Sequence, residues 1–153
     1  MGEQKYTTKV IEAINSGVMI TKDNKLASFD IPALLRALFD QDNSMYVNVL
    51  KKLDIDPKEV SQLIDSYILN SVKTSSSEEP QSSADVKNLL YNASKYQQEF
   101  QDDYMSVEHL LLAQFDCKHS LIQRLKDLVG YKKDGFKKAI LSIRGGNHVT
   151  SDN

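Results

Sequence analysis

Apolar residues recur at helical spacing along most of the chain, and the most apolar stretch runs from Met105 to Phe115. It begins at Ser106, a favoured N-cap because its hydroxyl can accept an otherwise unpaired backbone N–H of the first turn. Glu108 then places negative charge at the positive end of the helix dipole. The residues that follow, among them Leu110 and Leu111, are too apolar for a helix with one solvated face. The pattern therefore predicts a helix that is largely buried.

A related stretch occurs earlier in the chain: Phe29–Asp40 matches Met105–Asp116 at a constant spacing of 76 residues, which places Ile31 on Val107. The identical pairs are Leu34/Leu110, Leu35/Leu111, Ala37/Ala113, Phe39/Phe115 and Asp40/Asp116. The same spacing superposes apolar residues of two other predicted helices, Val10 on Val86 and Ile64 on Ile140. An internal repeat of this length indicates two copies of one helical unit that pack as a pair.

Capping residues and apolar spacing together predict four helices in the first copy. They run from Thr7 to about Thr21, from Asp30 as the cap of the second, over Met45–Leu53, and from the cap Asp56, where Pro57 takes the first helical position. The second copy starts near Ser83 and repeats this order. No stretch shows the alternation of a strand, so we predict an all-α fold, a pseudo-twofold tandem of two four-helix repeats.

The whole chain, 1–153, is predicted to be one domain of this kind. Its parts are the first repeat over 6–70, a linker over 71–83, the second repeat over 84–146, and the start of a connection to a following module over 147–153. The linker is rich in Ser and Glu and has few large apolar residues, so we expect it to be flexible and exposed to proteases.

Composition narrows the class of protein. The chain has 153 residues, 41% of them hydrophobic and 26% charged, as in an ordinary globular domain. A net charge of −2 gives no electrostatic reason to expect nucleic acid or a membrane surface as partner. No apolar run approaches the roughly 20 residues of a membrane span. The single Cys117 fits a reducing compartment, and we expect a cytoplasmic location, or an organellar matrix if a targeting segment has been removed.

Met1-Gly2 resembles the start of a lipidation signal, but Tyr6 stands where Ser or Thr is needed. We interpret the pair as an addition to the natural sequence.

The sequence offers little catalytic chemistry. It has no Gly-rich phosphate-binding motif, so we expect no ATP site and no other cofactor in this chain. His109, His119 and His148 are far apart, and Cys117 with His119 supplies only two ligands where structural zinc usually takes four. Cys117 and His119 are also too close in sequence to orient as a nucleophile and its base. We therefore expect neither a metal site nor an enzyme.

Three stretches, MSVEHLLLAQF, its copy FDIPALLRALF and the ending AILSIRGGNHVTS, resemble the Clp N-terminal repeat domain of ClpB-type AAA+ chaperones. ClpC and ClpA carry related domains, and IRGG followed by VTS favours the ClpB type. The resemblance covers about residues 6–146. It implies an all-α pseudo-dimer that acts as a monomeric accessory domain of a hexameric disaggregase. The ATP and Mg²⁺ of such a protein would bind outside this chain.

The resemblance also implies partners and contact residues. The domain is expected to bind exposed hydrophobic segments of unfolded or aggregated polypeptides, and relatives bind adaptor proteins or phosphoarginine. The family's substrate-contacting positions correspond here to Thr7, Asp102 and Glu108. The first copy has Pro32 where the second has Glu108, which argues against phosphoarginine binding.

The repeat adds an expectation about exposure. Leu112 aligns with Arg36, so we expect Leu112 to be more exposed than Leu111 and to form part of a peptide-binding groove. His109 lies one turn before Leu112 on the same face, and Tyr96 is expected at the border of the groove. The alternative is that Leu112 covers the linker or the other repeat.

Simpler structural roles and other function classes stay open at this stage. Thr7 can simply cap a helix. Asp102 can be an ordinary acidic residue of a turn, and Glu108 an acidic residue in the first turn of a helix. The function alternatives are the N-terminal domain of a ClpC- or ClpA-type unfoldase, a stand-alone helical adaptor or scaffold, and a small helical enzyme.

Overall fold

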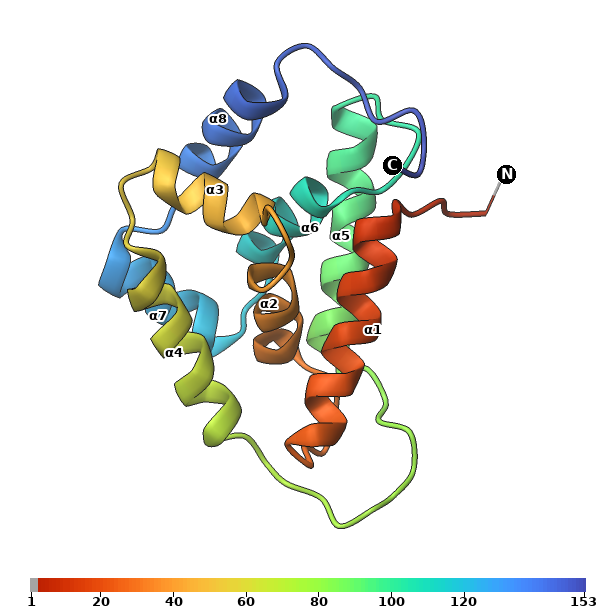
Figure 1. Cartoon of the computed structure of the whole chain (residues 1–153), viewed down its shortest axis with the longest axis vertical. Helices are drawn as coiled ribbons and strands as arrows, with labels where there is room; N and C mark the ends of the chain where they lie inside the picture. The colour runs from red at the N-terminus through yellow and green to blue at the C-terminus, as the bar shows by residue number, and fades with distance from the viewer. Residues whose placement is uncertain (1–2) are drawn as a thin grey trace.

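The computed structural model describes residues 3–153, so the interpretation of Met1-Gly2 lies outside the described residues (Figure 1). All regular secondary structure of the described chain is helical: it has three isolated β-bridges and no strand. The first half contains α1 (Thr8–Asp23), α2 (Ile31–Phe39), α3 (Met45–Lys52) and α4 (Pro57–Leu69). The second contains α5 (Ala84–Glu99), α6 (Val107–Ala113), the 3₁₀ turn η1 (Gln114–Asp116), α7 (Ser120–Val129) and α8 (Lys133–Arg144). The predicted all-α tandem fold is confirmed.

Equivalent caps begin equivalent helices. The Thr7 hydroxyl accepts the backbone N–H of Val10 at 3.3 Å, and 76 residues later the Ser83 hydroxyl accepts that of Val86 at 3.1 Å. Asp30 also precedes a helix, but its side chain makes no cap hydrogen bond. Its carboxylate instead accepts hydrogen bonds from the Ser83 hydroxyl and the His119 ring, both in the second half of the chain.

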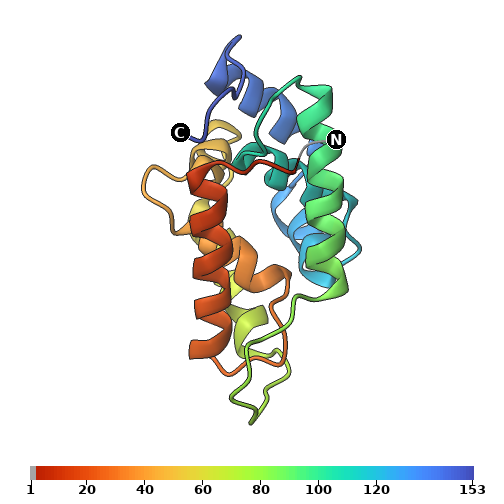
Figure 2. The same cartoon turned by 90° about the vertical axis from the view of Figure 1, so that its right-hand side faces the viewer.

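The short helices α2 and α6 occupy the middle of the molecule (Figure 1). α1 packs against α2, and α5 packs against α6. α1 and α5 run antiparallel along one face of the molecule, with α2 and α6 behind them (Figure 2). The elements α3, α4, α7 and α8 enclose the opposite side (Figure 1).

The central helix is as buried as its apolar sequence predicts. Every residue from Met105 to Phe115 is buried, and both Leu111 and its copy Leu35 are fully enclosed. In the first copy, Gly17 lets α1 approach the residues just before α2 closely, since a Cβ there would lie 2.5 Å from the ring of Phe29.

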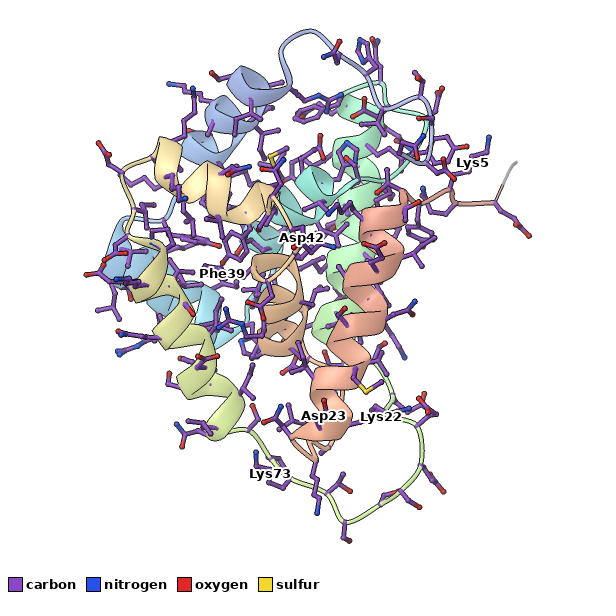
Figure 3. All side chains as sticks on the ribbon, in the orientation of Figure 1. Lys5, Lys22, Asp23, Phe39, Asp42 and Lys73 are labelled. Carbon is purple, nitrogen blue, oxygen red and sulfur yellow. The ribbon has the colours of Figure 1, made fainter. Side chains whose placement is uncertain are left out.

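No helix forms between Leu69 and Ala84, the part of the chain that contains the predicted linker. Both ends of this segment pair with the loop after α1: Ala27 N–H donates to Val72 O, and Phe29 N–H donates to Gln81 O, each at 2.9 Å. Lys22 at the end of α1 and Lys73 in the linker lie at the same end of the molecule (Figure 3). Among the described helices, none has the length and apolar character needed to cross a bilayer.

Candidate functional site

Asp102, in the turn between α5 and α6, is the centre of a buried polar cluster. The Arg144 guanidinium donates two hydrogen bonds to its carboxylate, at 2.6 and 2.8 Å. The His109 ring and the backbone N–H of Val149 donate two more, at 2.7 and 2.8 Å. Burial alone raises the pKa of this carboxyl, but the hydrogen bonds from Arg144, Val149 and His109 outweigh it and hold the pKa below the ordinary 3.8. Asp102 is therefore a buried anion held by four donors.

The contacts of His109 define its protonation state. Its Nδ1 accepts the backbone N–H of Ser106 at 2.8 Å, so the proton of the neutral ring is on Nε2 and points at Asp102. Burial lowers the pKa of His109 below its usual 6.5, although Asp102 and Glu108 act in the opposite direction. His109 thus fixes the start of α6 and orients Asp102 from within the protein.

Thr7 and Glu108 meet at a small cavity of about 180 Å³ between the start of α1 and the start of α6. Its lining includes the apolar Val107 and Met45 and the polar Ser106, and Val149 forms part of its rim. Asp102 lies one layer deeper and reaches this site through its bond to Val149. The structure therefore brings Thr7 and Glu108 together and places Asp102 behind them.

The expected exposure of Leu112 is wrong, because its side chain has 0% of its surface exposed, as has His109. The comparison with the first copy failed because Arg36, which aligns with Leu112, is itself mostly buried, with 13% of its side chain exposed. Its stem is buried, and only the guanidinium reaches out to Asp40 and Asp65. A charged residue at an equivalent position therefore did not mark a solvated site.

Tyr96 lies apart from the Thr7–Glu108 cavity. Its hydroxyl donates to Asp116 at 2.6 Å, and Lys133 binds the same carboxylate at 2.9 Å. Burial and Asp116 raise the pKa of Tyr96 above 10, so it stays a neutral donor. Tyr96 ties α5 to η1 and does not border a groove with Leu112.

Sequence reasoning missed two groups of residues. The first is Arg144 and Val149, which complete the Asp102 cluster from the far end of the chain. The second is an apolar surface that we name the α1/α5 face, made of Ile11, Ile14, Val18, Leu90 and Tyr91. The available signal was a second apolar stripe on α1, since Ile11, Ile14 and Val18 share one side at helical spacing, next to the core stripe.

The direction of this stripe follows from its surroundings. The other flank of α1, with Glu12 and Ile20, faces Asp40 at the end of α2. On α5 the equivalent flank carries Tyr96, which faces Asp116. Leu90 lies six residues before Tyr96 and points about 120° away from it. Helical spacing therefore places the stripe of α1 and Leu90 of α5 on the flanks that border the surface between these two helices, which lie side by side in Figure 2.

One cluster has the residue types of a metal site. Ligand atoms of Asp30, Asp85 and His119 lie within 4.8 Å of one another. However, the Nδ1 of His119 accepts the backbone N–H of Leu121 at 3.1 Å, which leaves the proton on Nε2, the atom that faces Asp30. A metal ion at Nε2 would displace that proton to Nδ1, which could then no longer accept the N–H of Leu121 that caps α7. We therefore interpret the cluster as a hydrogen-bonded contact between the two repeats.

The geometry defines an all-helical binding domain of two fused four-helix units. Residues 5–128 match the model of the Clp repeat (R) N-terminal domain. The chain is 32% identical over 159 aligned positions to the chaperone protein ClpB of Staphylococcus epidermidis, an alignment that covers all of this chain and 18% of that protein. The chain thus spans about a fifth of the length of the curated relatives it matches.

Solved structures agree on the fold. The Hsp104 N-terminal domain from Candida albicans superposes with a TM-score of 0.85 at 18% identity and covers 98% of both chains. The N-terminal domain of the ClpV1 ATPase from E. coli superposes with a TM-score of 0.76 at 17% identity, over 91% of this chain and 84% of the other. The chain belongs to the Clp repeat N-terminal domain family, the non-catalytic N-terminal part of ClpB and Hsp104 chaperones.

Proposed function

We propose that this chain captures exposed apolar segments of unfolded or aggregated polypeptides for an ATP-driven disaggregase of the ClpB type. The full-chain alignment with proteins named ClpB supports this assignment. The hexameric ATPase ring, with its ATP and Mg²⁺, belongs to the remainder of such a protein, which acts in the cytoplasm. An adaptor protein is a second class of partner for the same surface.

The observation that carries the proposal is the α1/α5 face. Ile11 on α1 is 47% exposed and Tyr91 on α5 is 68% exposed, while Ile14, Val18 and Leu90 on the same two helices are partly exposed. Large apolar side chains gathered on one surface mark interaction sites more often than scattered ones do. A surface of aliphatic and aromatic side chains binds apolar segments without requiring one sequence, which suits capture of many unfolded clients.

Thr7 and Glu108 add polar anchoring at one end of this face. Thr7 is the cap of α1, so it lies at the end of the helix that carries Ile11 and Ile14. Glu108 lines the cavity next to it, and its carboxylate, which lies 3.7 Å from Arg144, can accept a backbone N–H of an extended peptide. A client would thus place apolar side chains on the α1/α5 face and part of its backbone at the Thr7–Glu108 cavity.

The test is fluorescence anisotropy with a labelled, permanently unfolded casein. Ile11→Ser and Tyr91→Ser should each weaken binding by at least about fivefold, as expected for apolar contacts in a binding surface. Leu128→Ser is the matched control, because Leu128 is also an exposed apolar residue but lies on α7, away from this face. Equal weakening in the control, or no weakening in the two test variants, would contradict the proposal.

A further inference from the structure

The segment 147–153 folds back onto the domain after α8 and lies against the cavity that contains Thr7 and Glu108. Arg144 holds its first residue by donating two hydrogen bonds to Asn147 O, at 2.7 and 3.0 Å. The His148 ring lies 2.9 Å from the carbonyl of Phe100. The segment then runs beside the turn that follows α5 toward the start of α1 (Figure 1).

Val149 is bound through its main chain on both sides. Its N–H donates to the Asp102 carboxylate at 2.8 Å, and its carbonyl accepts from the N–H groups of Asp103 and Tyr104, at 2.8 and 3.3 Å. Val149 also forms part of the rim of the cavity. Contacts of this kind recognise an extended backbone whatever its sequence, with one pocket for a side chain.

Asp152 contacts the start of α1. Its carbonyl accepts the backbone N–H of Thr8 at 2.8 Å. That N–H belongs to the first turn of the helix, where donors have no partner within the helix and the dipole is positive. Asn153 follows on the rim of the cavity. A segment of seven residues therefore occupies this site as a bound peptide would.

We propose that the segment 147–153 is an internal ligand of the Thr7–Glu108 site and competes with client polypeptide for it. The inference rests on the proposed function, because it names what the client must displace. It also defines the ligand chemistry of this site: a peptide with one N–H for the Asp102 carboxylate, one carbonyl for the Asp103 N–H, a small apolar residue at the rim of the cavity and a second carbonyl for the start of α1.

The competition has a calculable consequence. A site that is open for only a fraction of the time shows an affinity reduced by that fraction. If the segment is docked nine-tenths of the time, releasing it strengthens client binding about tenfold. Fixing it in place removes the contribution of this site altogether.

The experiment compares two forms of the whole chain, both with Cys117→Ser, in casein binding. Val149→Pro opens the site, because Pro has no N–H for Asp102, and Val149→Asp opens it independently by placing a carboxylate beside Asp102 and Glu108. Thr8→Cys with Asp152→Cys closes it by a disulfide, since the two backbones are in direct hydrogen-bond contact. We expect about tenfold tighter binding by the opened variants, weaker binding by the closed one, and recovery when the disulfide is reduced.

The outcomes separate the two proposals. If the opened and closed forms bind casein like the parent, while Ile11→Ser and Tyr91→Ser bind weakly, the competition is refuted and the proposed function stands. If thiol titration shows that the disulfide does not form, the docking itself is wrong. If no form binds casein, the proposed function fails and this inference fails with it. Melting temperatures within a few degrees of the parent confirm that each variant is folded.

Discussion

Arg144, the last residue of α8, donates two hydrogen bonds to the Asp102 carboxylate, at 2.6 and 2.8 Å, and so joins the end of the last helix to the turn after α5. Both side chains are almost completely buried. The pair also brings the segment after α8 to the candidate site, because the same two residues bind Asn147 and Val149.

Removing Asp102 should therefore destabilise the whole domain. In Asp102→Ala the buried Arg144 loses its hydrogen-bonded carboxylate and keeps only the more distant one of Glu108, at 3.7 Å, while the His109 ring loses its acceptor. We expect a loss of about 3–5 kcal/mol in the free energy of unfolding. Urea denaturation measures it. Glu99→Gln is the control, because it breaks the Glu99–Lys137 pair, which is half exposed and contributes at most about 1 kcal/mol. Equal losses in the two variants would show that the Asp102 cluster is not a buried structural unit.

The fold was predictable from the sequence because helix signals are local. Thr7 and Asp56 each cap the helix that they were predicted to begin, and Ser83, near which the second copy was predicted to start, caps α5. The buried stretch around Leu111 was evident from its composition. These features depend on residues within one or two turns of each other, so no knowledge of the tertiary structure was needed.

The candidate site was less predictable, because its contacts join residues far apart in the chain. Val149 reaches Asp102 over 47 residues, and nothing in the local sequence of either indicates the pairing. Leu112 was misplaced for a related reason: exposure depends on which neighbours cover a residue, and the charge of Arg36 gave no measure of that. Thr7 and Glu108 were brought into the prediction by a family resemblance, and the structure places them on one cavity.

A pH titration tests the state of His109. Its pKa is lowered in the folded protein, so below about pH 6.5 the unfolded chain takes up a proton that the native ring does not. The stability that the neutral ring provides is present above pH 6.5 and is lost as the pH falls toward the folded pKa. The loss is at most about 1.4 kcal/mol per pH unit.

Comparison with His109→Gln isolates this effect, because the two proteins differ only at position 109. Between pH 7 and 5 the parent should lose stability faster than the variant, measured by urea denaturation at each pH. A parent that gains stability relative to the variant on acidification would mean that His109 is protonated beside Asp102 in the native state.

The burial of Leu112 predicts that it is as important to folding as Leu111. Both side chains are fully enclosed, so Leu111→Ala and Leu112→Ala should each leave a cavity and cost about 2–5 kcal/mol. Leu69→Ala is the control, since Leu69 is 71% exposed and its loss should change stability by no more than about 0.5 kcal/mol. If Leu112→Ala melts like Leu69→Ala, then Leu112 is solvated after all.

The linker should be the first site of proteolysis. Residues 75–80 lie beyond the hydrogen bonds that fix the ends of the linker at Val72, Thr74 and Gln81, and most of them are exposed. Limited digestion with a protease of broad specificity, followed by mass spectrometry, should give two fragments that stay associated, because the helices around the cut share one core. First cleavage within α6 would be incompatible with its burial.

Gly17 provides a test of how closely α1 packs on Phe29, just before the start of α2. An alanine in an exposed part of a helix would stabilise it by up to about 1 kcal/mol relative to glycine. At Gly17, however, the new Cβ would lie 2.5 Å from the ring of Phe29, which is itself buried and cannot move aside freely. Overpacking of this kind costs about 1–3 kcal/mol, so we expect Gly17→Ala to lower the free energy of unfolding despite the better helix propensity.

The partner side chain gives the decisive comparison. Phe29→Leu alone should destabilise the core, but it removes the ring atoms that a Cβ at position 17 would meet. In the Phe29→Leu background, Gly17→Ala should therefore cost less than in the parent, a coupling that a double-mutant cycle measures. Gly146→Ala is the control for the substitution itself, because a Cβ at that position meets no atom within 4 Å. If Gly17→Ala costs the same in both backgrounds, the close approach of α1 to Phe29 is not what requires glycine at this position.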